Sequence, residues 1–167
     1  VRDIAVTLPA GFSFIQFAEL FRPTAFAFDQ FGQLYVASFD GTIHVLLDYD
    51  GDGRAEIDAL YYSGLSTPLG LSFRPGTNDL YVSDQGRINI LKDSDGDFIV
   101  DEVRSLVQNL PYGRHQNNEL IFGPDGWLYV GIGSTCDACD EADPRSATIM
   151  RIDPDSGAGF SIATGLR

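Results

Sequence analysis

The sequence predicts an all-β protein, a β-propeller with about three four-stranded blades. The tripeptide Leu-Tyr-Val occurs three times, beginning at Leu34, Leu80 and Leu128, and so recurs after 46 and then 48 residues. A repeat of roughly 40–50 residues built from short strands is typical of propeller blades. Apolar runs bounded by Gly, Asp and Pro indicate strands rather than helices. Because propellers close with about four to eight blades, we expect these three to form only part of a ring.

The repeats also predict the organisation of the chain. We expect blades at residues 21–66, 67–113 and 114–167, and one or two strands in residues 1–20 that pair with a blade outside the repeats. The third blade carries an insert at residues 135–146. An insert at a fixed point of a repeat is a loop on one face of the ring, often the binding face. Because the chain begins at Val1 and ends just after a strand-like segment, we expect a fragment or a mature chain.

The composition argues against two kinds of partner. The net charge is −13 and the chain holds only 11 Lys and Arg, whereas nucleic-acid binding needs clustered basic residues. No stretch approaches the roughly 18 consecutive apolar residues of a membrane-spanning helix. The acidity suits calcium binding or simple solubility.

Two cysteines, Cys136 and Cys139, form a CxxC motif that is followed by Asp140. Without a following His, the motif does not attach a c-type haem, and without a second pair it does not build a zinc site. A local disulfide and a free dithiol remain. In an acidic chain rich in Asp and Gly loops we favour the disulfide, and with it a secreted or periplasmic protein.

Two aspartate-rich loops stand 45 residues apart. In each, carboxylates occupy positions 1, 3, 5 and 9, and a curled loop brings such oxygens to the one point that calcium requires. The alternative is a hairpin turn that uses Asp and Gly for their backbone conformations. We expect the second loop to curl less tightly, because Phe98 stands where the first loop has Gly53. The candidate calcium ligands are Asp48, Asp50, Asp52 and Glu56, and Asp93, Asp95, Asp97 and Asp101.

A polar run, residues 114–119, leads into the first strand of the third blade. At that position it would line the mouth of the central channel, where His115 could accept a proton near neutral pH. The alternative is that His115 and Asn117 cap the turn by hydrogen bonding. The other histidine, His44, lies within a predicted strand and is interpreted as a structural or surface residue.

The run from Arg114 through the Gly-Pro-Asp-Gly turn at residues 123–126, together with CxxC and the terminal Gly-Leu-Arg, resembles the soluble glucose/sorbosone dehydrogenases. The resemblance is strong over the third blade and general over the other two. It implies the N-terminal half of a six-bladed propeller that uses pyrroloquinoline quinone (PQQ) and calcium. It also implies that His115 is the base that takes the proton of a sugar hydroxyl, and that Gln116 and Arg167 contact the cofactor.

Two departures from that family stand out. Arg114 occupies the place where members with glucose activity have an acidic residue, and the approach to the second blade offers Leu65 and Ser66 instead of a Gln. The groups that hold the cofactor's calcium would lie beyond Arg167, so any calcium in the aspartate loops would be structural. Two functions therefore stay open: a PQQ-dependent sugar dehydrogenase or part of one, and a non-catalytic, calcium-stabilised binding or scaffold module. Half a ring also predicts a homodimer that completes it.

Overall fold

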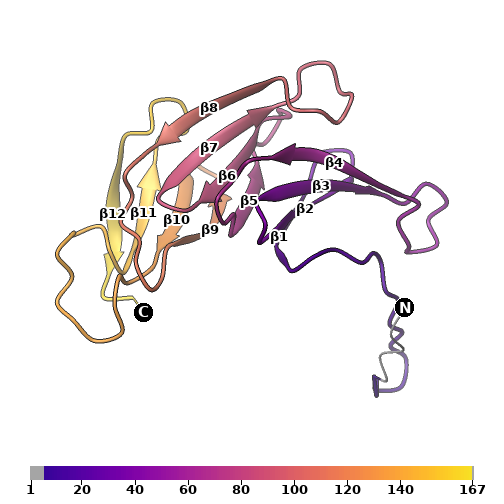
Figure 1. Ribbon diagram of the computed structural model, residues 1–167, viewed down its shortest axis with the longest axis horizontal. Coiled ribbons are helices and arrows are strands. Elements are labelled where there is room, and N and C mark those ends of the chain that lie inside the picture. Colours follow the sequence, from indigo (N-terminus) through magenta and orange to yellow (C-terminus); the bar gives the residue numbers. More distant parts are fainter. Residues whose placement is uncertain (1–5, 167) are drawn as a thin grey trace.

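The computed structural model describes residues 6–166 and shows three four-stranded antiparallel sheets that fan out into an open arch (Figure 1). The first sheet holds β1 (Pro23–Phe28), β2 (Leu34–Ser38), β3 (Thr42–Leu47) and β4 (Ile57–Ser63). The second holds β5 (Gly70–Phe73), β6 (Leu80–Asp84), β7 (Arg87–Lys92) and β8 (Glu102–Val107). The third holds β9 (Asn117–Phe122), β10 (Leu128–Ile132), β11 (Thr148–Ile152) and β12 (Gly159–Thr164). The predicted fold class is confirmed.

Each sheet is a simple meander in which consecutive strands pair. The Leu-Tyr-Val copies form the second strand of every sheet, and the Phe-containing run before each copy forms the first. The first strands lie on the concave side of the arch, where β5 contacts both β1 and β9. The fourth strands, β4, β8 and β12, lie on its convex side (Figure 1). Residues near the start of β9 therefore face the space that the arch encloses.

Apolar side chains fill the two spaces between neighbouring sheets. Between the first and second sheets, Tyr35 packs edge-on against Tyr61 and Phe73, with ring centroids 4.9 Å apart in both pairs. Between the second and third sheets, Tyr81 packs against Phe122 in the same way, and its hydroxyl donates to the carbonyl oxygen of Pro154 at 3.0 Å. Edge-to-face contacts of this kind add to the burial of apolar area. The three repeats thus stack into one continuous body.

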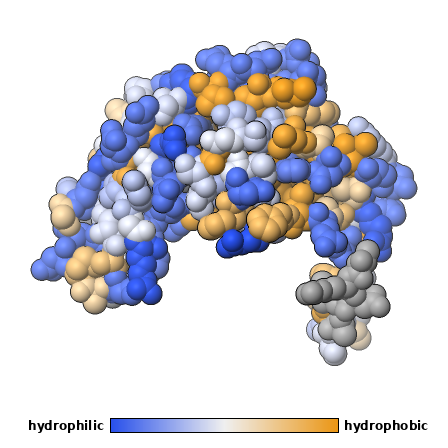
Figure 2. All heavy atoms as spheres, in the orientation of Figure 1, coloured by the Kyte–Doolittle hydropathy of each residue, from blue (hydrophilic) through white to orange (hydrophobic). Residues whose placement is uncertain are grey.

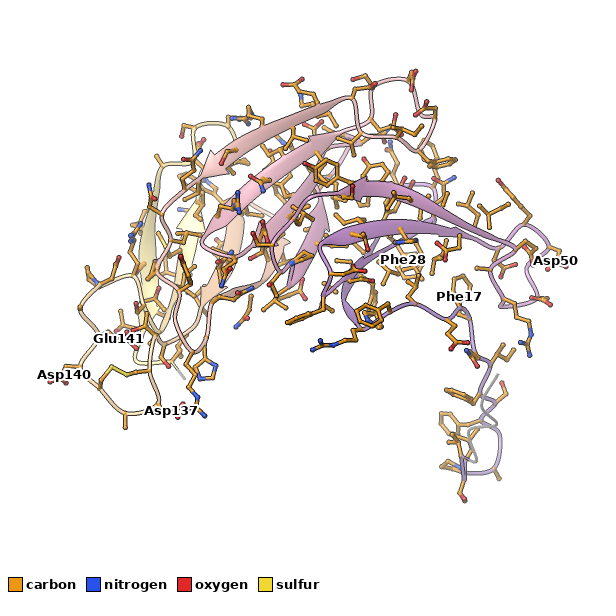
Figure 3. The ribbon with its side chains drawn as sticks, viewed as in Figure 1. Phe17, Phe28, Asp50, Asp137, Asp140 and Glu141 are labelled. Atoms are coloured by element: carbon orange, nitrogen blue, oxygen red, sulfur yellow. A yellow bond between two sulfur atoms is a disulfide. The ribbon has the colours of Figure 1, made fainter. Side chains whose placement is uncertain are left out.

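The N-terminal segment, residues 6–20, forms no strand in the structure. It runs beside the first sheet, where the carbonyl oxygen of Phe17 accepts a hydrogen bond of 2.9 Å from the amide of Ala55. Phe17 and Phe28 line one hollow at this edge (Figure 3). Figure 2 shows hydrophobic residues gathered on this side of the arch, near β1. Pairing of this segment with a further blade stays a prediction.

The described residues contain no helix long and apolar enough to cross a membrane.

Candidate functional site

The strands of the arch carry different loops at their two ends. The end at which β1, β5 and β9 begin holds the polar run before β9, the β6–β7 turn and the insert of residues 135–146. The opposite end holds both aspartate-rich loops, 48–56 and 93–101. Figure 3 shows this separation between Asp50 and the insert residues Asp137, Asp140 and Glu141. The aspartate loops are therefore remote from His115.

Backbone hydrogen bonds fix the position of His115. Its amide donates to the carbonyl oxygen of Ser134 at 3.2 Å, and the amide of Arg114 donates to the carbonyl oxygen of Thr135 at 3.0 Å. The amide of Gly133 donates to the carbonyl oxygen of Gln116 at 3.0 Å. The polar run is thus paired, residue by residue, with the segment that opens the insert.

This pairing needs a glycine. A Cβ atom on Gly133 would lie 2.6 Å from the Cβ of His115 and 2.9 Å from the carbonyl oxygen of Gln116. Contacts that short do not occur between real side chains, so any other residue would push His115 away from the insert.

The side chain of His115 is exposed and faces a carboxylate. Its Nε2 atom lies 3.7 Å from Oδ1 of Asp137, and about half of each side chain is accessible to solvent. The second oxygen of Asp137 forms an ion pair of 2.7 Å with the guanidinium of Arg114. An imidazole, a carboxylate and a guanidinium therefore lie together at the mouth of the arch.

Gln116 and Asn117 point into the boundary between the second and third sheets. The amide nitrogen of Gln116 donates to the carbonyl oxygen of Thr67 at 2.8 Å. Asn117 is fully buried, and its side-chain nitrogen donates to acceptors on Ser83, Asp84 and Arg87. Asn117 in this way caps the β6–β7 turn of the neighbouring sheet. The expected contact between Gln116 and a cofactor stays a prediction.

Asp84 is a buried carboxylate at the same end. Its Oδ1 atom accepts hydrogen bonds from the amides of Ser66 and Thr67, at 2.9 and 2.7 Å. Its Oδ2 atom lies 3.2 Å from Nε of Arg87, but the angle does not make a hydrogen bond, so this oxygen has no hydrogen-bond partner among the described residues. Asp84 holds the approach to β5 and leaves a negative, buried oxygen beside an exposed guanidinium.

The insert is an ordered loop. Cys136 and Cys139 are joined by a disulfide, as expected. The hydroxyl and the amide of Thr135 both donate to the carboxylate of Glu141, at 2.6 and 2.9 Å, and these hydrogen bonds hold the pKa of Glu141 below its usual range. Arg145 similarly lowers the pKa of Asp143, with which it makes hydrogen bonds of 2.7 to 3.3 Å.

The first aspartate loop brings its carboxylates together. One oxygen from each of four residues lies within 4.8 Å of the others, and the four residues are Asp48, Asp50, Asp52 and Glu56. Both oxygens of Asp48 accept backbone hydrogen bonds, from Gly51 at 2.7 Å and Gly53 at 2.9 Å, so the loop is already curled around this side chain.

The second loop has the same curl, and the expectation that Phe98 would hinder it is wrong. Phe98 adopts a left-handed conformation with φ of 66°, and its amide donates to Oδ2 of Asp93 as Gly53 does to Asp48. Its side chain packs against the core between the first and second sheets, which offsets the strain of that backbone. The gathered set is smaller than in the first loop: Asp93, Asp95 and Asp101 come together, and Asp97 is not part of the set.

Two further predicted residues need comment. Arg167, expected to contact a cofactor, lies outside the described residues. His44 lies on β3, and its Nδ1 atom contacts the carboxylate of Asp58 on β4, which agrees with a structural role. Sequence reasoning missed Asp84 and Asp137. The acidic character of the insert pointed towards Asp137, but nothing in the repeat pattern distinguished Asp84 from other residues of a strand end.

The family model for a domain of unknown function, DUF7133, matches residues 5–165. The chain belongs to the DUF7133 family. No curated protein matches it.

Solved structures resemble this DUF7133 chain in fold. The PQQ-bound aldose sugar dehydrogenase of Streptomyces coelicolor has a TM-score of 0.69 and 22% identity, over 84% of this chain and 47% of that one. A protein of Carbohydrate-Active Enzymes family AA12 from Trichoderma reesei has a TM-score of 0.73 and 20% identity, over 92% of this chain and 42% of that one. The holo PQQ domain of pyranose dehydrogenase from Coprinopsis cinerea has a TM-score of 0.68 and 16% identity, over 81% and 34%.

The DUF7133 chain spans less than half the length of these three solved structures. At identities near 20% the likeness is one of fold. The resemblance to soluble sugar dehydrogenases expected from the sequence is confirmed at that level.

Proposed function

We propose that this chain is part of a PQQ-dependent sugar dehydrogenase, in which His115 takes the proton of the sugar hydroxyl that is oxidised. The position of His115 carries the proposal. Its exposed imidazole is fixed by backbone pairing just before β9, on the concave side of the arch, and the arch has the fold of sugar dehydrogenases. A base must be reachable by substrate and held in place, and His115 meets both conditions.

The side chains around His115 fit one wall of a quinone site. PQQ carries carboxylates and quinone oxygens, for which guanidinium groups are well suited. The side chains of Arg87 and Arg114, at this end of the arch, are 44% and 68% exposed. Gln116 faces the same boundary but is bonded to Thr67, so it would contact the cofactor through its remaining polar atoms. Arg167 would add a third guanidinium.

The chain's own groups would work as follows. PQQ, when bound, supplies a two-electron acceptor for the hydride of the sugar carbon. His115 accepts the hydroxyl proton on an imidazole nitrogen. Asp137 lies beside that imidazole, and Arg114 pairs with Asp137. Asp84 fixes the backbone of Ser66 and Thr67, and through Thr67 the side chain of Gln116. These contacts keep the polar wall rigid while substrate enters from the open mouth.

We propose calcium in the first aspartate loop as a structural ion. Four carboxylates with oxygens within 4.8 Å of one another repel in the absence of a cation, and hard oxygen ligands select calcium. The second loop, with three gathered carboxylates, would bind it more weakly. Both loops lie at the end of the arch opposite His115, so neither would hold the calcium of a quinone site.

The disulfide favours an exported protein, secreted or periplasmic, in which it would persist. The missing part of the ring would come from further residues of the parent protein or from a second copy. In either arrangement His115 faces the enclosed channel. In a ring made of two copies, the groups that hold the cofactor's calcium would be absent, and PQQ would bind weakly.

The test measures sugar oxidation by the full-length parent protein, supplied with PQQ and calcium. A panel of aldoses serves as substrates, and a dye serves as the electron acceptor. His115→Gln should lower kcat by about 10²–10⁴-fold, the usual contribution of a positioned base. Asp29→Asn, in the β1–β2 turn at the opposite end of the arch, should leave kcat unchanged. Quinone-dependent oxidation that survives His115→Gln would refute the assigned role. If no sugar is oxidised and PQQ does not bind, the non-catalytic module is the correct function.

A further inference from the structure

We propose that Asp137, carried on the disulfide-closed loop Cys136–Cys139, is a positioning residue for His115 that selects its tautomer. The catalytic role of Asp137 rests on the proposed function. Its effect on the tautomer of His115 rests only on contacts within this chain. It gives the insert of the third sheet a purpose that the repeat itself does not supply.

Nε2 is the imidazole nitrogen that faces Asp137, with 3.7 Å between it and Oδ1. A carboxylate accepts hydrogen bonds and cannot donate them, so it favours the neutral tautomer that carries its proton on Nε2. The distance is longer than a hydrogen bond, and such contacts commonly tighten only when substrate binds. The lone pair is then left on Nδ1, which becomes the nitrogen that accepts the substrate proton.

Arg114 is the residue directly before His115, and its guanidinium acts on the carboxylate of Asp137. Arg114 binds the far oxygen of Asp137 at 2.7 Å, so its charge is directed at the carboxylate. Arg114, Asp137 and His115 thus form a chain in which the arginine orients the carboxylate and the carboxylate orients the imidazole. The carboxylate reaches the histidine from the insert, and the residue before the histidine holds it there.

An exposed carboxylate on a loop positions a neighbour only if the backbone of that loop is held in place. The disulfide closes a four-residue loop around Asp137. The hydroxyl of Ser134 donates to the carbonyl oxygen of Cys136 at 2.7 Å, and Thr135 is bonded to Glu141. Because Ser134 and Thr135 are also the backbone partners of His115 and Arg114, one short segment fixes both the histidine and the loop.

Of the other charged groups at this end of the arch, three have partners of their own, and the exposed Asp140 of the insert makes no ion pair with His115 in the part of the chain that the structure describes. Glu141 accepts hydrogen bonds from Thr135, Asp143 is paired with Arg145, and Arg87 lies beside Asp84. Among the described residues, Asp137 and Arg114 are therefore the charges that act most directly on His115. Removal of Asp137 would leave the imidazole beside an unneutralised guanidinium.

The experiment reads the tautomer of His115 from the ¹⁵N chemical shifts of its imidazole, at alkaline pH where the ring is neutral. The chain has only two histidines, and each faces one carboxylate: His115 faces Asp137, and His44 contacts Asp58. Asp137→Ala and Asp58→Ala are therefore matched variants, each with the other histidine as internal control. No cofactor is needed, so the result does not depend on whether sugars are oxidised.

We expect Asp137→Ala to lower the ratio of Nε2–H to Nδ1–H tautomer at His115 by about threefold, for a charge at this distance in a solvated site, and to leave His44 unchanged. Asp137→Glu should restore much of the ratio, and the double variant Cys136→Ser with Cys139→Ser should lower it as Asp137→Ala does. An unchanged His115 ratio in Asp137→Ala overturns the proposal. An unchanged ratio in the double serine variant overturns the part played by the disulfide. In the active protein, Asp137→Ala should lower kcat while KM is unchanged; a change in KM alone overturns positioning.

Discussion

The side-chain amide of Asn117 donates to the hydroxyl of Ser83 at 2.6 Å, across the boundary between the second and third sheets. The same nitrogen reaches the carbonyl oxygens of Asp84 and Arg87, and the side-chain oxygen accepts from the amide of Gly86 at 2.9 Å. One buried side chain thus satisfies four polar groups of the β6–β7 turn. These contacts also fix the polar run of residues 114–119 at a position two residues after His115.

We predict that Asn117→Ala destabilises the chain by about 2–4 kcal/mol, because it leaves several buried donors and acceptors unpaired and each costs about 1–3 kcal/mol. Asn118→Ala, its exposed neighbour, should change stability by less than about 0.5 kcal/mol. Urea denaturation of the two variants beside the parent chain measures both. Equal midpoints would show that the Asn117 hydrogen bonds contribute nothing net.

Calcium should raise the melting temperature. An ion that binds only the folded loop stabilises it by mass action, by about 2.7 kcal/mol at a hundredfold excess over its Kd. Asp48→Asn should remove most of this gain, because Asp48 is central to the four gathered carboxylates. Asp29→Asn is the matched control: Asp29 caps a turn at the same end of the arch, with its Oδ1 bonded to two backbone amides.

Melting curves in excess EDTA and in millimolar calcium test whether calcium binds the aspartate loops. If they coincide for the parent chain, both aspartate loops are plain turns. A calcium response that persists in Asp48→Asn would place the ion elsewhere.

The ordered insert should loosen in acid. Hydrogen bonds from Thr135 lower the pKa of Glu141 in the folded chain, so their contribution to stability is fully present above the ordinary glutamate pKa of about 4.3 and is lost as pH falls through the lowered pKa. The amide proton shift of Thr135 should therefore titrate with a midpoint below that of an unfolded glutamate. In Glu141→Gln this titration should vanish; a midpoint at or above 4.3 would contradict the assigned hydrogen bonds.

The sequence predicted the sheets well because the repeated residues are the ones that form the strands. Leu34, Leu80 and Leu128 begin equivalent strands, and the alternation around them places Tyr35 and Tyr81 in the cores between sheets. Phe98 shows where propensity alone fails. The positive φ of Phe98 is locally unfavourable, but its ring packs against the core and this packing stabilises the loop. A comparison of the two loop sequences does not show that packing.

The candidate site was predicted only in part, for a different physical reason. His115 was found because it belongs to a polar run before an inner strand, which is a local signal. Asp137 lies 22 residues further on, and its approach to His115 depends on the backbone pairing with Ser134 and on the glycine at 133. The contact between Asp137 and His115 depends on the conformation of the insert, which the repeat pattern does not predict.

The outward faces of the first and third sheets, here called the outer faces of the arch, carry exposed apolar side chains. Ala25 and Leu120 lie in the cores, so their strand neighbours point to the opposite faces, where Phe26 of the first sheet is 69% exposed and Ile121 of the third is 64% exposed. Apolar sheet faces of this kind recruit other chains. We therefore expect the isolated chain to self-associate, and a closed ring of two copies would bury both faces.

Light scattering over a range of concentrations measures this association. Phe26→Glu should shift the chain towards monomer, because it places a charge on a face that must be covered. Ile99→Glu, at a position of similar exposure in a loop, should not. A parent chain that stays monomeric at high concentration would show that the outer faces do not attract one another. Association that Phe26→Glu leaves intact would place the contact at another surface, and the ring of two copies would then be wrong.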